Sequence, residues 1–125
     1  MSYQEDKAMC DDFTAAGAIY PKVYPEDIEA MMQTLRYEVH VIPNTTTTVC
    51  SAILPVGDCD FVIATGETAC IDKRNFNPEL GAKYARENCE KAARSELWRL
   101  EGYAKARDLL AEKKLMEQIA ANKAE

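Results

Sequence analysis

The sequence has few of the side chains on which most enzymes and metal sites depend. It contains a single histidine, His40, and none of the GxSxG, Walker-type, GxGxxG or HExxH motifs of common enzyme families. Its five cysteines are an odd number and include no CxxC pair, so the usual spacing of zinc ligands is missing. We therefore expect no metal and no cofactor, and we expect binding rather than catalysis.

The sequence also lacks long hydrophobic runs and a basic leader. No stretch of about 18 apolar residues exists, so we expect no transmembrane helix and no membrane contact. The first residues, MSYQEDKAMCDDF, are acidic and contain no basic segment followed by an apolar one, unlike a secretory signal. These features favour a reducing cytosol, in which the thiols stay free.

Clustered positive charge is the third absence. The formal net charge is −6, and residues 1–44 alone hold eight acidic and three basic side chains, a net charge of −5. Duplex nucleic acid is a poor partner for such a surface, because its binding depends on cations that neutralise phosphates. The acidic surface either keeps the protein soluble or engages a basic host protein, and composition does not decide between the two.

The N-terminal residues differ from the rest of the chain. Residues 1–24 have no sustained periodicity and are interrupted by Gly17 and Pro21, which predicts a flexible arm. The remainder, residues 25–125, is predicted to be one α+β domain. It opens with a short helix, since Pro25 suits a first helical turn and apolar residues then recur at helical spacing.

Residues 25–72 are predicted to combine this helix with a small sheet. The segment 37–41 alternates apolar and polar side chains, 45–54 is rich in β-branched residues, and 60–65 forms a third apolar run. Residues 67–71 are a candidate extension. The connections are short, so we predict an antiparallel meander of three or four strands.

Helical periodicity extends over residues 77–121, which predicts a long helix or a helical hairpin. Gly102 either breaks this helix or permits close packing. Such a helix extends beyond what a small sheet can cover, so its distal apolar residues need a partner. We predict a homo-oligomer whose interface is formed by Leu109, Leu110, Leu115, Met116 and Ile119.

The stretch CIDKRNFNPELG, residues 70–81, contains the best candidate for a ligand site. Lys73 and Arg74 lie just before a predicted helix start, where free backbone N–H groups favour an anion. Together they could hold a phosphate while Asn75 and Asn77 contact a base or ribose. Trp98 could supply a stacking surface if another subunit brings it close.

A second interpretation of the same stretch is purely structural. Asn77 is a good N-cap and Pro78 a good first helical residue, so the segment could simply start the helix. The neighbouring run Thr45–Thr48 is equally open, because four hydroxyls either line a polar pocket or belong to an ordinary edge strand. We carry both interpretations forward.

Four ordered motifs give the chain a family resemblance. They are TVC at residues 48–50, GETAC at 66–70, NFNPELG at 75–81 and W-x-LEGY at 98–103. Over about residues 36–110 the sequence resembles a family of small tailed-phage proteins named after gene products of an N-four-type coliphage and a Shigella phage. The resemblance implies a bacteriophage accessory protein that acts in the cytoplasm of the infected host.

The resemblance implies no catalytic motif, and by analogy small phage proteins of this kind bind a host target or counter a host defence. The expected sheet followed by long helices is also similar to oligomeric sponges with which phages sequester immune cyclic nucleotides. Our leading hypothesis is therefore capture of a small anionic nucleotide signal. The alternatives are an acidic inhibitor of a host protein and a small nucleotide-processing enzyme.

Overall fold

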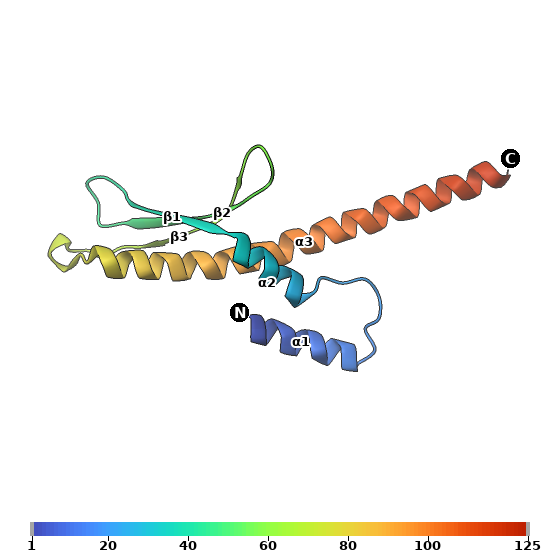
Figure 1. Ribbon diagram of the computed structural model, residues 1–125, viewed down its shortest axis with the longest axis horizontal. Coiled ribbons are helices and arrows are strands. Elements are labelled where there is room, and N and C mark those ends of the chain that lie inside the picture. Colours follow the sequence, from blue (N-terminus) through green and yellow to red (C-terminus); the bar gives the residue numbers. More distant parts are fainter. Residues whose placement is uncertain (1, 125) are drawn as a thin grey trace.

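The computed structural model of the chain describes residues 2–124, which form three α-helices, three β-strands and one short 3-10 turn (Figure 1). In chain order these are α1 (Tyr3–Ala15), α2 (Pro25–Thr34), β1 (Arg36–Val41), β2 (Thr48–Leu54), β3 (Phe61–Thr68), η1 (Lys73–Asn75) and α3 (Pro78–Ala124). The order of elements confirms the predicted α+β class.

The three strands form an antiparallel meander in which β2 is central. Tyr37 of β1 lies opposite Ala52 of β2, and Ala52 lies opposite Ala64 of β3. A register shift between Ala52 and Ile53 bends the β2–β3 ladder. Of the candidate extension 67–71, Glu67 and Thr68 are the end of β3 and residues 69–71 lie in the following loop, so no fourth strand is present in residues 2–124.

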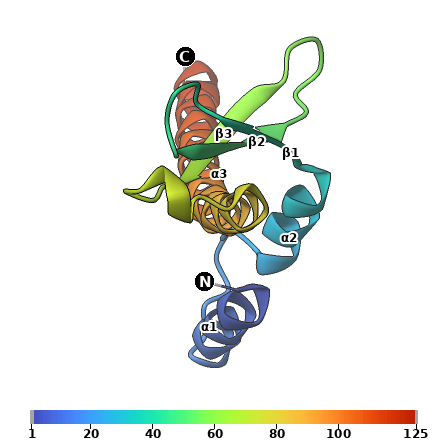
Figure 2. The ribbon, with the colours of Figure 1, turned by 90° about the vertical axis from the view of Figure 1, so that its left-hand side faces the viewer.

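One face of the sheet rests on the first half of α3 (Figure 2). The α3 residues that form this contact recur at every fourth position, which places them on one side of the helix. They are mostly small and, apart from the first, buried: Gly81, Ala85, Cys89, Ala93 and Leu97. Small side chains let the axis of the helix approach the sheet closely.

The closest approach is at Gly66 of β3. A Cβ atom placed on Gly66 would lie 2.4 Å from the backbone nitrogen of Cys89 and 2.7 Å from the carbonyl oxygen of Ala85. Real Cβ atoms do not approach backbone atoms so closely, so only glycine allows the strand and the helix to touch here. Position 66 therefore requires glycine because a larger residue has no space there, and not because of its backbone conformation.

The second half of α3 extends away from the rest of the molecule (Figure 1). The helix has 47 residues, so it is about 70 Å long at about 1.5 Å per residue. It continues through Gly102 without a break, and nothing lies within 4 Å of the Cβ position of Gly102, so within one chain this glycine neither breaks the helix nor permits close packing. Despite this length, none of the helices in the described part of the chain has an apolar stretch suited to crossing a bilayer.

The predicted arm contains a helix that the sequence analysis did not identify. Ser2 and Glu5 form a capping box at the start of α1: the Ser2 hydroxyl accepts from the Glu5 backbone N–H, and the Glu5 carboxylate accepts from the Ser2 N–H. This pattern is the sequence signal of a helix start that was overlooked. The predicted division of the chain at residue 24 stays a prediction.

A polar cluster joins α1 and α2 to α3. The indole Nε1 of Trp98 donates to Oδ2 of the buried Asp6 at 2.8 Å. Arg94 lies between two carboxylates, with Nη2 at 2.9 Å from Oε2 of Glu29 and Nη1 at 3.9 Å from Oδ2 of Asp6. Because Asp6 is fully buried, separating α1 from α3 would require these polar groups to be rearranged together.

The glycine contact gives a direct test of the fold. Gly66→Ala should lower the free energy of unfolding by about 3 kcal/mol or more, because the new methyl group meets backbone atoms that cannot rotate away. Gly102→Ala is the matched control: nothing lies within 4 Å of its Cβ position, and helix propensity predicts a gain of about 0.5–1 kcal/mol. Urea denaturation measures both changes, and equal stability of the two variants would contradict the packing described here.

Candidate functional site

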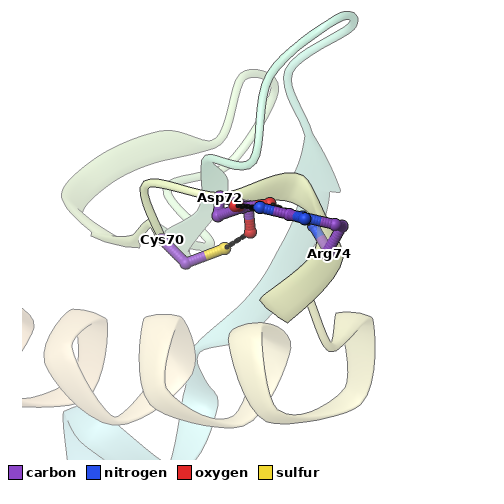
Figure 3. Close-up of polar contacts among 3 residues, drawn as sticks. All are labelled: Cys70, Asp72 and Arg74. Carbon is purple, nitrogen blue, oxygen red and sulfur yellow. Dashed lines mark hydrogen bonds and ion pairs between the residues drawn. The ribbon is translucent and has the colours of Figure 1, made fainter.

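The loop between β3 and α3 contains the predicted cations, and the structure gives them different surroundings. Lys73–Asn75 form the short turn η1, which is capped by the Asp72 side chain accepting from the Arg74 backbone N–H at 2.8 Å. The Arg74 guanidinium also pairs with Asp72, with Nη2 at 2.5 Å from Oδ2 and Nε within 3.1 Å of both oxygens (Figure 3). These hydrogen bonds hold the pKa of the Asp72 carboxyl below its ordinary value. Arg74 is therefore already engaged, whereas Lys73 forms no ion pair within residues 2–124.

Asn77 acts as the cap of α3. Its side-chain oxygen accepts hydrogen bonds from the backbone N–H groups of Glu79 at 3.1 Å and Leu80 at 3.2 Å, and its carbonyl accepts from Gly81 at 2.9 Å. The donors that would bind an anion at a helix start are thus occupied within the chain. The structure does not offer the N-terminus of α3 as a free phosphate site.

A groove lies between the β1–β2 turn and the loop after β3. Its volume is about 640 Å³, and five of its seven lining residues have polar side chains: Asn44, Thr45, Thr46, Thr47, Ile71, Lys73 and Phe76. Two of the threonines help to fix its walls, because the Thr45 hydroxyl donates to the carbonyl of Ile42 and the Thr46 hydroxyl donates to the carbonyl of Cys70. Lys73 is the only cation among these lining residues.

A smaller pocket of about 180 Å³ adjoins this groove. The two cavities share Thr46 and Phe76, and the smaller one reaches Asn75, Asn77 and Tyr84. Phe76 therefore stands between two concave surfaces. The sequence analysis noted that the threonines could line a polar pocket, but it missed Phe76 and Tyr84 as lining residues.

The pairing of the strands is enough to predict where the groove lies. Thr48 lies opposite Thr68 in the β2–β3 ladder, so the residues just before Thr48 must pass close to the residues just after Thr68. The antiparallel meander alone thus places the threonine run beside the cationic loop. That pairing could have been inferred from the predicted topology.

Trp98 is not part of this surface within one chain. It lies fourteen positions beyond Tyr84 on α3, about 21 Å along the helix axis at about 1.5 Å per residue. Its indole nitrogen donates to Asp6 of α1, which gives the side chain a structural role. Any contact of Trp98 with a ligand in the groove would require another subunit.

The apolar residues of the projecting part of α3 are all exposed, between 40% and 62%. They are Leu109, Leu110, Leu115, Met116 and Ile119. At about 100° per residue, Leu110 faces away from the other four and lies on the side of Leu100 and Tyr103. The five residues of the predicted interface therefore lie on two apolar arcs of the helix.

Two cysteines lie in the core and do not resemble nucleophiles. Cys50 and Cys89 are fully buried, and the Cys89 thiol donates to the carbonyl of Ala64 at 3.6 Å. Burial raises the pKa of both thiols, and that of Cys89 reaches about 12, so it stays protonated at physiological pH. Within residues 2–124, no three His, Cys, Asp or Glu side chains gather into a metal site.

With the geometry established, comparison with known proteins identifies the family. The profile of the phage protein (N4 Gp49/phage Sf6 gene 66) family matches residues 23–109, well over half of the chain. The protein belongs to this family, which confirms the resemblance seen in the motifs. The match covers α2, the sheet, the groove and the first two thirds of α3, while α1 and the end of α3 lie outside it. No curated protein and no solved structure gave a significant match.

Alkylation can test the state of the core thiols. At pH 8 iodoacetamide should modify the exposed Cys59 readily, while Cys50 and Cys89 should react only when the chain unfolds. Because the Cys89 pKa rises from 9.0 to about 12 on folding, its contribution to stability is present below pH 9 and is lost as the pH rises toward 12. Peptide mass spectrometry measures the labelling of each thiol. Urea denaturation measures the free energy of unfolding, to which Cys89 should contribute less at pH 10 than at pH 8. Equal labelling of Cys89 and Cys59 in the folded chain would show that the thiol is accessible.

Proposed function

We propose that this phage protein acts in the cytoplasm of the infected bacterium by binding a small anionic nucleotide, and so counters a host defence that uses such a signal. The observation that carries the proposal is the groove beside Lys73. It combines one cation that has no ion-pair partner in the described residues with a polar wall of threonines and an aromatic ring.

The dimensions and chemistry of the groove support a nucleotide. Its volume of about 640 Å³ falls within the usual range of small-molecule sites, about 300–1,000 Å³. The ammonium group of Lys73 suits a phosphate, and the ring of Phe76 offers a face for a base. The amide of Asn44 and the hydroxyl of Thr47 are hydrogen-bonding groups suited to a sugar or a base edge.

Arg74 is a candidate for a second phosphate contact. It is exposed and paired with Asp72 on the surface, where water weakens such a pair. A bound phosphate could therefore compete with Asp72 for the guanidinium, since an arginine fork fits both groups in the same way. Asn75, next to Arg74 in the chain, lines the smaller pocket, while Asn77 keeps its capping role.

We also propose that the chain works as a homo-oligomer through the projecting end of α3. In a single chain, the large apolar residues on the two arcs are exposed to water, which is unfavourable. A second copy of the chain is the simplest partner that would bury them. Two arcs favour contact with more than one neighbouring helix over a simple two-stranded coil.

A ligand screen by thermal shift tests the nucleotide proposal. Cyclic di- and trinucleotides and ADP-ribose derivatives are the probes, and a ligand at one hundred times its Kd should stabilise the fold by about 2.7 kcal/mol. Lys73→Ala should weaken binding by roughly ten- to a hundredfold, because a charge-assisted hydrogen bond is lost. Lys105→Ala, an exposed lysine on the projecting helix, is the matched control and should leave the shift unchanged.

Two results would contradict the proposal. One is the absence of any shift with every probe at millimolar concentration. The other is a shift that survives both Lys73→Ala and Thr47→Val, which would place the ligand elsewhere.

Light scattering with α3 variants tests the oligomer separately. Leu115→Lys combined with Ile119→Lys should raise the dissociation constant about a hundredfold or more, since both charges enter one apolar arc. Ala106→Lys lies outside both arcs and should leave the mass unchanged. A wild-type monomer at 100 µM, or equal masses for both variants, would contradict the helix interface.

A further inference from the structure

The strand β1 presents a free backbone edge. The Ile42 N–H donates to the Thr47 carbonyl, which makes this a hydrogen-bonded pair of the β1–β2 hairpin. Hydrogen-bonded and non-hydrogen-bonded pairs alternate along an antiparallel ladder, so Tyr37, Val39 and Val41 direct their N–H and C=O groups away from β2. No other backbone group among residues 2–124 bonds to this edge.

The same edge exposes apolar side chains. Val39, Val41 and Ile42 are 42%, 39% and 40% exposed, although Val39 and Val41 point to the side of the sheet that α3 covers. Free backbone groups beside exposed β-branched side chains form a surface on which another strand can add. Natural proteins usually block such an edge with charged side chains, above all lysine, or with proline or a bulge. β1 has no lysine, proline or bulge, and its two charged side chains, Arg36 and Glu38, are of opposite sign.

We propose that β1 pairs with β1 of a second copy, antiparallel and centred on Val39. The result is a continuous six-stranded sheet with a twofold axis through its middle. Because that axis is perpendicular to the sheet, both copies of α3 lie on the same face. This contact is separate from the proposed interface at the end of α3, and it does not depend on a ligand.

The sequence of β1 selects this register over its neighbours. Backbone pairing requires the outward-facing residues 37, 39 and 41 to lie opposite outward-facing residues of the partner strand. One strand can therefore slide past the other only by two residues at a time, and each such slide moves the centre of the pair by one residue. Centring on Val39 places Glu38 opposite His40 of the partner subunit and Tyr37 opposite Val41 of the partner subunit. An acidic residue then faces a basic one twice, and an aromatic residue faces a β-branched one twice.

The adjacent registers are less favourable. Centring on residue 38 places Glu38 opposite Glu38 of the partner subunit, so that like charges meet directly. Centring on residue 40 places His40 opposite His40 of the partner subunit and leaves Glu38 opposite an apolar residue. Within Arg36–Val41, centring on residue 40 also aligns only three residues, whereas centring on residue 38 or 39 aligns five. The charge pattern therefore disfavours both neighbouring registers, and the strand length disfavours the one centred on residue 40.

The neighbours of β1 hold it in the conformation that the pairing needs. The Arg86 guanidinium of α3 lies over the Tyr37 ring, 4.5 Å from its centroid, and Arg36 pairs with Asp60 next to β3. The carboxylate of Glu38 is only loosely held within its own chain, since its nearest cation is Arg36 Nε at 3.8 Å. The Glu38 carboxylate is therefore available to pair with His40 of the partner subunit.

Charge exchange across the pair tests the proposal, with mass measured by light scattering in the Leu115→Lys/Ile119→Lys background. That background should be a dimer at 100 µM through β1. Glu38→Lys should raise the dissociation constant at least tenfold, because Lys and His would then face each other, and so should His40→Glu. The double variant Glu38→Lys/His40→Glu restores opposite charges and should recover the dimer.

Further variants separate the interface from the fold. Val39→Pro removes an outward N–H without touching the β1–β2 ladder, so it should give a folded monomer with an unchanged far-ultraviolet circular dichroism spectrum. Glu67→Lys makes the same charge change on the opposite edge strand and should leave the dimer intact. A monomeric background, or a dimer that survives Val39→Pro, would overturn the proposal. Ligand shifts in the groove are measured independently, so failure here leaves the proposed function untouched.

Discussion

The backbone contact between Gly66 and α3 sets the arrangement of the rest of the structure. It brings β3 against Ala85 and Cys89 with no side chain between them, and the buried thiols and alanines then complete a thin core. Since β3 ends close to the start of α3, the connecting loop must fold back beside the β1–β2 turn, and the groove forms between them. The same contact divides α3, because small residues suit the half on the sheet while the large apolar residues lie beyond it.

Much of the fold could be predicted because its local signals agree with its packing. The alternation around His40 predicted β1, and the Asn77-Pro78 start predicted α3 within one residue. The helix α1 could not be predicted from periodicity, since its one buried side chain is polar: Asp6, held by Trp98 far away in sequence. Gly102 did not break α3 because a glycine costs a helix only about 1 kcal/mol relative to alanine, which a helix of 47 residues tolerates.

The candidate site was only partly visible in the sequence. Lys73 and Arg74 were predicted together as phosphate ligands, and of the two only Lys73 forms no ion pair in the described residues. Arg74 instead pairs with Asp72, and Asn77 caps α3, which is the alternative role that its sequence position also predicted. Phe76 was missed because its place between two cavities depends on how distant segments meet, which periodicity does not report.

The central claim is that the groove beside Lys73 binds an anionic nucleotide, and amide chemical-shift mapping tests it most directly. Titration of an isotope-labelled chain with the best nucleotide from the screen should move the amide signals of residues 44–47 and 71–76 first and furthest. The signals of α1 and of the projecting end of α3 should stay in place at the same ligand concentration. Shifts centred on α1 and α2, or no saturable shift at residues 71–76, would contradict the account.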